Sequence, residues 1–126
     1  MSFQTPLAKV RGLGSAKAGS GHFWMQIVTA ISLIPLSLWM VSFTEKLLDT
    51  PYEEMVSWLA EPLNTALGIA WVIAAFYHAA LGLQVVIEDY VHTEWIKISV
   101  ILVTKLTFFF FAIAAIVALF RISSLG

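Results

Sequence analysis

The sequence predicts an all-helical integral membrane protein with three transmembrane helices. Three observations lead to this fold class: 60% of the 126 residues are hydrophobic, only 12% are charged, and the apolar residues gather in three long runs. A soluble domain carries about twice that charged fraction, and a disordered chain combines low hydrophobicity with high charge. The composition therefore excludes both classes, and a single domain over residues 1–126 is expected at this length.

Each apolar run is long enough to cross a bilayer as a helix, which takes about 20 mostly apolar residues. The runs cover residues 23–43, 63–87 and 96–120. The first two contain no Asp, Glu, Lys or Arg, and the third contains only Lys97 and Lys105. Strands of a membrane barrel are about 10 residues long and alternate strictly, unlike these runs. The first run is also longer than the apolar part of a signal peptide, which has about 7–15 residues.

The distribution of charge between the runs predicts their orientation. Three basic residues and no acidic residue precede the first run, whereas the segment after it is mostly acidic. Because positive charge in short flanking segments favours the cytoplasmic side, we expect residues 1–22 inside. The loop 48–62 then lies outside and the loop 88–95 inside. The three basic residues are Lys9, Arg11 and Lys17.

The expected outer loop carries the signals of a short helix lying at the membrane interface. Residues 50–53 read Thr-Pro-Tyr-Glu, which fits a capping box with proline at the first helical position. An apolar face follows, and Glu61-Pro62 ends the helix. That face consists of Met55, Val56, Trp58 and Leu59. Within the first span, Pro35 predicts a kink.

His78 is the leading candidate for chemistry, because polar groups at membrane depth are costly and mark functional sites. It lies near the middle of the second run, and Ala74 and Gly82 flank it one turn away on the same helix face. Such small neighbours leave room for a flat ring system, and a neutral imidazole is the usual axial ligand of haem iron. The alternative is a core histidine that hydrogen-bonds to a neighbouring helix.

Asp89 and Tyr90 form a second candidate site at the expected inner end of the second span. Asp89 follows His78 by eleven residues, or three helical turns, so both lie on one face about 16 Å apart. A tyrosine hydroxyl beside a carboxylate donates a hydrogen bond to a carbonyl such as that of a quinone, and the carboxylate orients it or relays a proton. The alternative is a solvated helix end with an interfacial tyrosine.

For two further polar residues, the sequence is compatible with two interpretations each. His22 precedes the first run, where it either contacts an anionic group, such as a propionate or a lipid head group, or is simply an interfacial histidine. Lys105 lies inside the third run, where it either snorkels to the inner surface or pairs with an acid of a partner chain. His92 is expected in the inner loop.

Several classes of function are excluded. The chain has no cysteine, so it forms no thiolate metal site and ligates no iron–sulfur cluster. Its net charge of -1 gives no field that attracts nucleic acid. No hydrolase triad or phosphate-binding loop is present, and the three runs hold one mid-membrane histidine. A second axial ligand would therefore come from another chain, which indicates a subunit of a complex.

The run 77–92, YHAALGLQVVIEDYVH, resembles the hydrophobic membrane anchor family of succinate dehydrogenase, the cytochrome b anchors. That family has a histidine, a glycine four residues on, and an Asp-Tyr pair eleven and twelve residues on. The matching residues here are His78, Gly82, Asp89 and Tyr90. Residues 19–24, followed by Thr29-Ala30, resemble the start of the family's first helix. The resemblance covers essentially the whole chain, including its length, three spans and orientation.

The resemblance implies a role for each candidate residue. His78 would be one axial ligand of haem b, and a sister anchor subunit would supply the other. Tyr90 would hydrogen-bond a ubiquinone carbonyl, with Asp89 in support, and His22 would lie near a haem propionate. One position departs from the pattern, since Ile27 stands where many relatives carry an arginine that faces the haem and quinone region. A residue of the sister subunit would then supply the positive charge.

The resemblance also implies partners and a location. The two anchors would hold a flavoprotein and an iron–sulfur protein, so FAD and the clusters belong to partner subunits and this chain alone does not act on succinate. The expected activity is electron transfer from succinate to quinone, in the tricarboxylic acid cycle and respiratory chain of a bacterial inner membrane rather than a mitochondrial one. Two alternatives remain: a fumarate-reductase-type anchor working with quinol, and a non-redox membrane subunit. Haem content separates the redox and non-redox classes.

Overall fold

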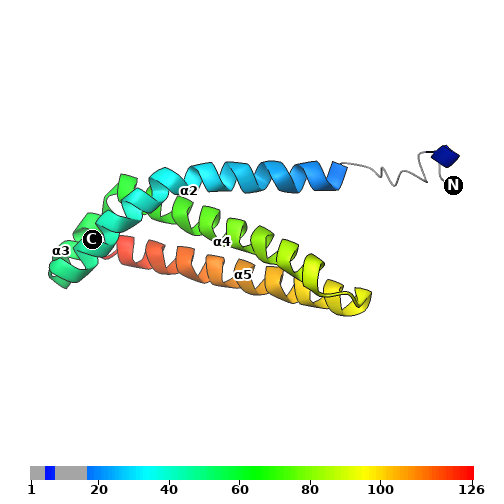
Figure 1. Cartoon of the computed structure of the whole chain (residues 1–126). Helices are drawn as coiled ribbons and strands as arrows, with labels where there is room; N and C mark the ends of the chain where they lie inside the picture. Colours follow the sequence, from blue (N-terminus) through cyan, green and yellow to red (C-terminus); the bar gives the residue numbers. More distant parts are fainter. Residues whose placement is uncertain (1–4, 8–16) are drawn as a thin grey trace.

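The computed structural model describes residues 5–7 and 17–126, and Figure 1 shows three long helices lying side by side with a short helix at one end. The basic residues Lys9 and Arg11, which support the predicted orientation, lie outside the described residues. In chain order the helices are α2 (Lys17–Asp49), α3 (Tyr52–Ala60), α4 (Pro62–Tyr90) and α5 (Glu94–Ser123).

The three predicted spans are confirmed. Their helices are long and apolar enough to cross a membrane, judged by length and composition, and the described residues contain no strand. Each helix extends beyond its predicted run, because polar residues at both ends of the runs continue the helical hydrogen bonding. α2 passes through Pro35 without a break. Its axis bends in its C-terminal half, in agreement with the predicted kink (Figure 1).

α4 is the central helix of the bundle. It packs against both α2 and α5, whereas α2 and α5 do not pack directly against one another anywhere in the described ranges. Few side chains are buried within the chain, and α5 has no buried residue at all. Helices that are apolar on every side bury their surface in lipid or against other proteins. Most of the apolar surface of α5 is therefore available to the bilayer and to partner chains.

A polar cluster around Asn64 holds α2, α3 and α4 together at the end of the bundle where α3 lies, which we call the α3 end. The Asn64 Oδ1 accepts a hydrogen bond from Trp39 Nε1 at 3.0 Å. Its Nδ2 donates to the Trp58 carbonyl at 2.9 Å and to Glu61 Oε2 at 3.3 Å. The rings of Trp39 and Trp58 stack with their centroids 5.9 Å apart. Each helix that meets here is thus fixed by a specific contact.

The close approach of the helices at the α3 end depends on Gly68 of α4. A Cβ atom at this position would lie 3.3 Å from Trp39 Cη2 of α2 and 3.4 Å from Leu119 Cδ1 of α5. These distances are at or below ordinary van der Waals contact, so a larger side chain would push both neighbours away. Small residues permit such close packing between membrane helices.

The short helix predicted in the loop is confirmed as α3, but its predicted capping box is wrong. The helix begins at Tyr52, and Pro51 is the N-cap residue rather than the first helical residue, with no side-chain cap hydrogen bond. The Thr50 hydroxyl instead donates to the Lys46 carbonyl at 2.5 Å. It is therefore used at the end of α2, and a hydroxyl has only one hydrogen to donate. Glu61 and Pro62 separate α3 from α4 as predicted.

The apolar face of α3 packs within the chain, a contact that the prediction of an interfacial helix did not include. Met55, Val56 and Leu59 are buried within the chain, and Trp58 is half-buried against Trp39. Through this face α3 packs on the ends of α4 and α5. The helical periodicity located the apolar face, but the same face serves equally well to cover the end of a bundle.

Replacing Asn64 by leucine should destabilise the folded chain by about 1–3 kcal/mol. The variant leaves the indole N–H of Trp39 without its acceptor and removes both bonds made by Nδ2. The loss would appear as a lower thermal unfolding midpoint of the purified protein in detergent. Ser57→Ala is the control, because the exposed Ser57 hydroxyl bonds only to the Glu53 carbonyl within α3. Equal midpoints for the two variants would show that the cluster does not stabilise the bundle.

Candidate functional site

His78 lies in the middle of α4 and faces α2. Its Nδ1 lies 2.9 Å from the hydroxyl oxygen of Thr29, a residue of α2 that is 6% exposed. The His78 Nε2 has no hydrogen-bond partner in the described part of the chain. One ring nitrogen thus makes the contact to a neighbouring helix that is expected of a core histidine. The other nitrogen keeps the capacity for a ligand that the functional alternative requires.

The helix face around His78 is covered at one end and open at the other. Ala74, one turn before, is buried, and His78 itself is half-buried. At Gly82, one turn after, a Cβ atom would meet nothing within 4 Å. α2 and α4 diverge toward the N-terminal end of α2, which explains the change along the face (Figure 1). The side of α4 from His78 to Gly82 therefore has room for a flat group or another chain.

Asp89 and Tyr90 are the last two residues of α4. They lie at the end of the bundle opposite α3, and we call this end the loop end. Both side chains are exposed, Tyr90 by 79%, and neither makes a side-chain hydrogen bond or ion pair within the described part of the chain. Because α4 is continuous from His78, Asp89 lies on the predicted face, about 16 Å along the helix. Residues 91–93, including the exposed His92, then lead to α5. This chain alone does not enclose a ligand at the Asp89-Tyr90 pair.

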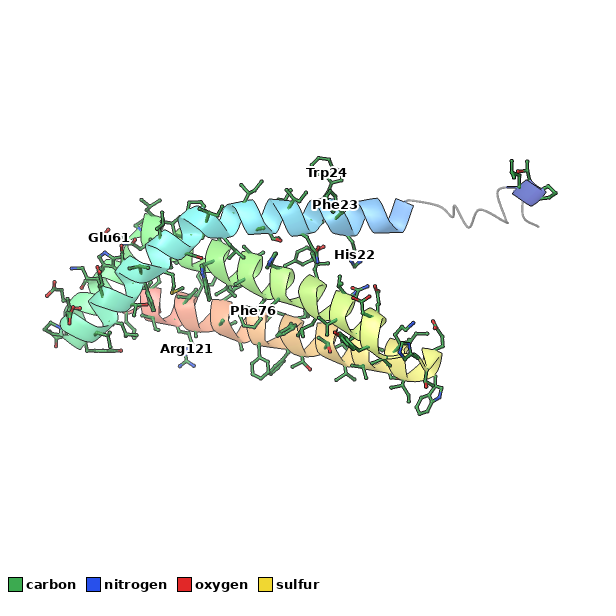
Figure 2. All side chains as sticks on the ribbon, in the orientation of Figure 1. His22, Phe23, Trp24, Glu61, Phe76 and Arg121 are labelled. Carbon is green, nitrogen blue, oxygen red and sulfur yellow. The ribbon has the colours of Figure 1, made fainter. Side chains whose placement is uncertain are left out.

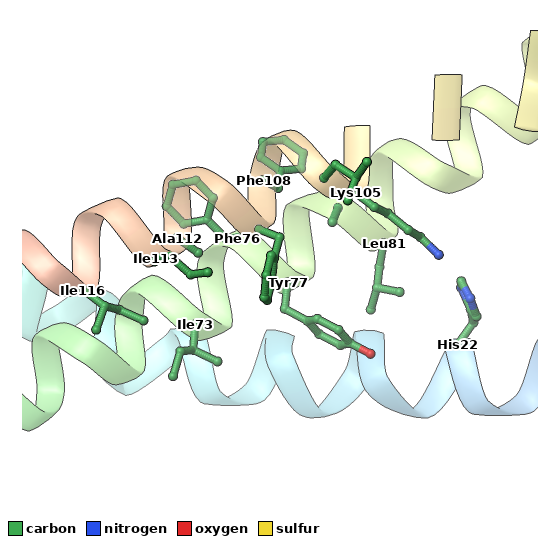
Figure 3. Close-up of a pocket in the computed structure, with 13 residues that line it drawn as sticks. His22, Ile73, Phe76, Tyr77, Leu81, Lys105, Phe108, Ala112, Ile113 and Ile116 are labelled. Atoms are coloured by element: carbon green, nitrogen blue, oxygen red, sulfur yellow. The ribbon is translucent and has the colours of Figure 1, made fainter. Parts of the chain in front are cut away.

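His22 faces the space between α2 and the other two helices. Figure 2 shows it projecting from α2 toward α4, whereas Trp24 projects away. It lines a cavity of about 610 Å³ whose wall is otherwise made mainly of apolar side chains of α4 and α5. The other polar groups in the wall are the hydroxyl of Tyr77 and the ammonium group of Lys105. Figure 3 shows the ends of the Lys105 and His22 side chains directed toward one another.

The structure does not bring all the predicted residues into one site. His22 shares its cavity with Lys105 and not with His78, which is absent from the cavity wall. Lys105 has no acidic partner among the described residues. Ile27, at the position where an arginine was expected, is half-buried in α2. His78, Asp89 and Tyr90 share one helix, and His22 and Lys105 gather beside it.

Sequence reasoning missed Thr29 as a partner of His78. The sequence pattern includes this residue only in the stretch that begins the first helix. The sequence does contain one indication of this position, because Thr29 lies seven residues after His22 and therefore on the same side of α2. Among the described residues, no group of three or more His, Cys, Asp or Glu side chains is placed so that it could hold a metal ion.

Residues 1–119 match the family described as succinate dehydrogenase/fumarate reductase transmembrane subunit. The chain belongs to this family. It is 37% identical over 118 residues to the succinate dehydrogenase hydrophobic membrane anchor subunit of Rickettsia bellii, and 34% identical over 119 residues to that of Rickettsia conorii. Both comparisons cover 94% of each chain. The anchor subunit of Paracoccus denitrificans is 27% identical over 90 residues, which is 71% of this chain and 70% of the relative.

Membership in this family of transmembrane subunits confirms the resemblance seen in the run 77–92. The three apolar helices and the bacterial relatives named as membrane anchors identify a multi-pass protein of a bacterial inner membrane, as predicted. The family description includes both succinate dehydrogenases and fumarate reductases.

Proposed function

We propose that this chain is the hydrophobic membrane anchor of a bacterial succinate dehydrogenase, in which it helps to bind haem b and forms part of the ubiquinone-reduction site. The observation that supports this most is the arrangement along α4. A half-buried histidine with a free Nε2 lies in mid-helix, and an exposed Asp-Tyr pair lies three turns away on the same helix. The relatives, named as succinate dehydrogenase anchors, favour the same function.

The residues around His78 fit a haem group. Nδ1 is already engaged by Thr29, so Nε2 is the atom left to ligate iron, and the open side at Gly82 leaves room for a planar macrocycle. When bound, haem b would supply a one-electron carrier within the membrane. The second axial ligand would come from a sister anchor subunit, because His22 and His92 lie elsewhere in this structure.

The Asp89-Tyr90 pair fits the reduction of a quinone at the membrane surface. Reduction of ubiquinone to ubiquinol takes up two electrons and two protons. The Tyr90 hydroxyl would donate a hydrogen bond to a quinone carbonyl, and the neighbouring Asp89 carboxylate would orient that hydroxyl or relay a proton from water. Both side chains are exposed at the loop end, where protons are accessible. A partner chain would cover the site, because this chain does not.

The exposed apolar helices and the charge distribution suggest how the complex is assembled. The sister anchor would pack on the open side of α2 and α4, and lipid would cover much of α5. Residues 1–22 and the loop 88–95 would face the cytoplasm. A flavoprotein with FAD and an iron–sulfur protein would bind on that side, oxidise succinate and pass electrons to the quinone. A fumarate-reductase-type anchor that works with quinol is the second candidate, because the family description includes it.

Deleting this chain from its bacterium should release succinate dehydrogenase activity from the membrane. We expect most of the succinate-to-dye activity in the soluble fraction after cell lysis, because the catalytic subunits would have lost their anchor. The measurement is the distribution of this activity between membrane and soluble fractions, with re-expression of the wild-type chain as the control. Activity that stays fully membrane-bound and still reduces quinone would contradict the anchor function.

A further inference from the structure

The hydroxyl of Thr29 makes three close polar contacts in the wall of the His78 site. Its Oγ1 lies 2.7 Å from the Met25 carbonyl oxygen, 3.1 Å from the Gln26 carbonyl oxygen and 2.9 Å from His78 Nδ1. Thr29 is 6% exposed, so water does not compete for these contacts. The three neighbours therefore determine how its single hydrogen and two lone pairs are used.

The contacts of Thr29 favour one position for the proton of the neutral His78 ring. A hydroxyl donates one hydrogen and accepts two, whereas a carbonyl oxygen only accepts. The Met25 carbonyl oxygen is the nearest of the three neighbours and the Gln26 carbonyl oxygen is a second acceptor, so the hydroxyl hydrogen is directed toward the backbone of α2. With the hydrogen directed there, the Thr29 oxygen is an acceptor toward His78, and this arrangement pairs it with an Nδ1–H donor. The neutral ring consequently presents its lone pair at Nε2.

We propose that Thr29 is a positioning residue for His78 that fixes the ring in the Nδ1–H tautomer and directs Nε2 toward the haem iron. This inference rests on the proposed function, because it assigns a role within the same haem site. Histidine ligands commonly donate their second N–H to a neighbouring acceptor, which fixes the ring orientation and strengthens the ligand. Here the acceptor belongs to α2 and the ligand to α4. The packing of these two helices thus sets the orientation of the ligand.

The test compares three substitutions at or near this contact in the assembled complex. Thr29→Val keeps the shape of the side chain and removes the hydroxyl, whereas Thr29→Ser keeps the hydroxyl. Thr44→Val is the matched control, because Thr44 lies on the same helix, is exposed, and bonds only to the Met40 carbonyl. The readouts are the ratio of haem to flavin, the electron paramagnetic resonance spectrum of the oxidised haem, and its midpoint potential.

Thr29→Val should retain haem about tenfold less tightly, the magnitude typical of a lost outer-shell partner of a metal ligand. The haem that remains should show altered resonance positions and a higher midpoint potential, since an imidazole without its acceptor donates less charge to ferric iron. Thr29→Ser and Thr44→Val should match wild type in all three readouts. If Thr29→Val does not assemble, the smaller Thr29→Ala is measured in the same way.

Wild-type haem retention, resonance spectrum and potential in the hydroxyl-free variant would overturn the role of Thr29. A residue that merely packed between the helices would change complex stability and leave the haem spectrum and potential unmoved, which also overturns it. Failure of the proposed function is distinguishable. In that case His78→Ala would leave haem content and spectrum unchanged whatever Thr29→Val does.

Discussion

A complex carrying Tyr90→Phe should reduce ubiquinone at least about tenfold more slowly than wild type, while it reduces a water-soluble dye with succinate at the wild-type rate. The substitution removes only the hydroxyl that would donate to the quinone carbonyl. The Tyr90 side chain is 79% exposed at the end of α4 and makes no hydrogen bond to the described residues, so the fold of this chain should not change. In the proposed complex, dye reduction would use electrons before they reach the membrane site and would report on the catalytic subunits alone.

The matched control is Tyr52→Phe. Tyr52 is 71% exposed on α3, at the opposite end of the bundle, so the same chemical change is made far from the proposed quinone site. Asp89→Asn should also lower quinone reduction, because an amide does not accept and pass on a proton as a carboxylate does. Quinone turnover in Tyr90→Phe equal to that in Tyr52→Phe would show that the hydroxyl has no part in the reaction.

His78→Ala should remove most of the haem b from the purified complex. An axial ligand contributes directly to iron binding, and no other described residue of this chain is placed to replace it, since His22 lies at the separate cavity and His92 in the exposed loop. The measurement is the amount of extractable haem per flavin. We expect this ratio to fall several-fold, or the remaining haem to change its ligation.

His92→Ala is the control for the His78 variant, because it removes an imidazole from the exposed loop at residues 91–93. Its haem-to-flavin ratio should equal that of wild type. A His78→Ala complex with the full wild-type amount of haem would assign ligation to other subunits and leave His78 as a helix-packing residue hydrogen-bonded to Thr29.

The spans and the candidate residues on α4 were predictable from the sequence for a physical reason. A bilayer requires about 20 consecutive apolar residues per helix, so hydropathy alone locates α2, α4 and α5. Once α4 is known to be continuous, helical spacing places His78, Gly82 and Asp89 on one face. These predictions depend on local sequence and the solvent, and not on how the helices pack.

The remaining features depend on packing between helices, which the sequence pattern does not specify. Thr29 contacts His78 only because α2 lies close to α4 at the level of these two residues. His22 shares a cavity with Lys105 because α2 diverges from the other helices toward its N-terminal end. For the same reason the sequence pattern assigns the apolar face of α3 to the membrane interface, although this face packs on the bundle. The pattern likewise assigns the Thr50 hydroxyl to α3, although it bonds within the end of α2.

The reduced-minus-oxidised visible spectrum of the purified complex, recorded for wild type beside His78→Ala, tests the haem-ligand role of His78 most directly. We predict a b-type haem band in wild type that is weakened or shifted in the variant, since His78 Nε2 would be an axial ligand. An identical band in both proteins, or no haem band in wild type, would contradict this role.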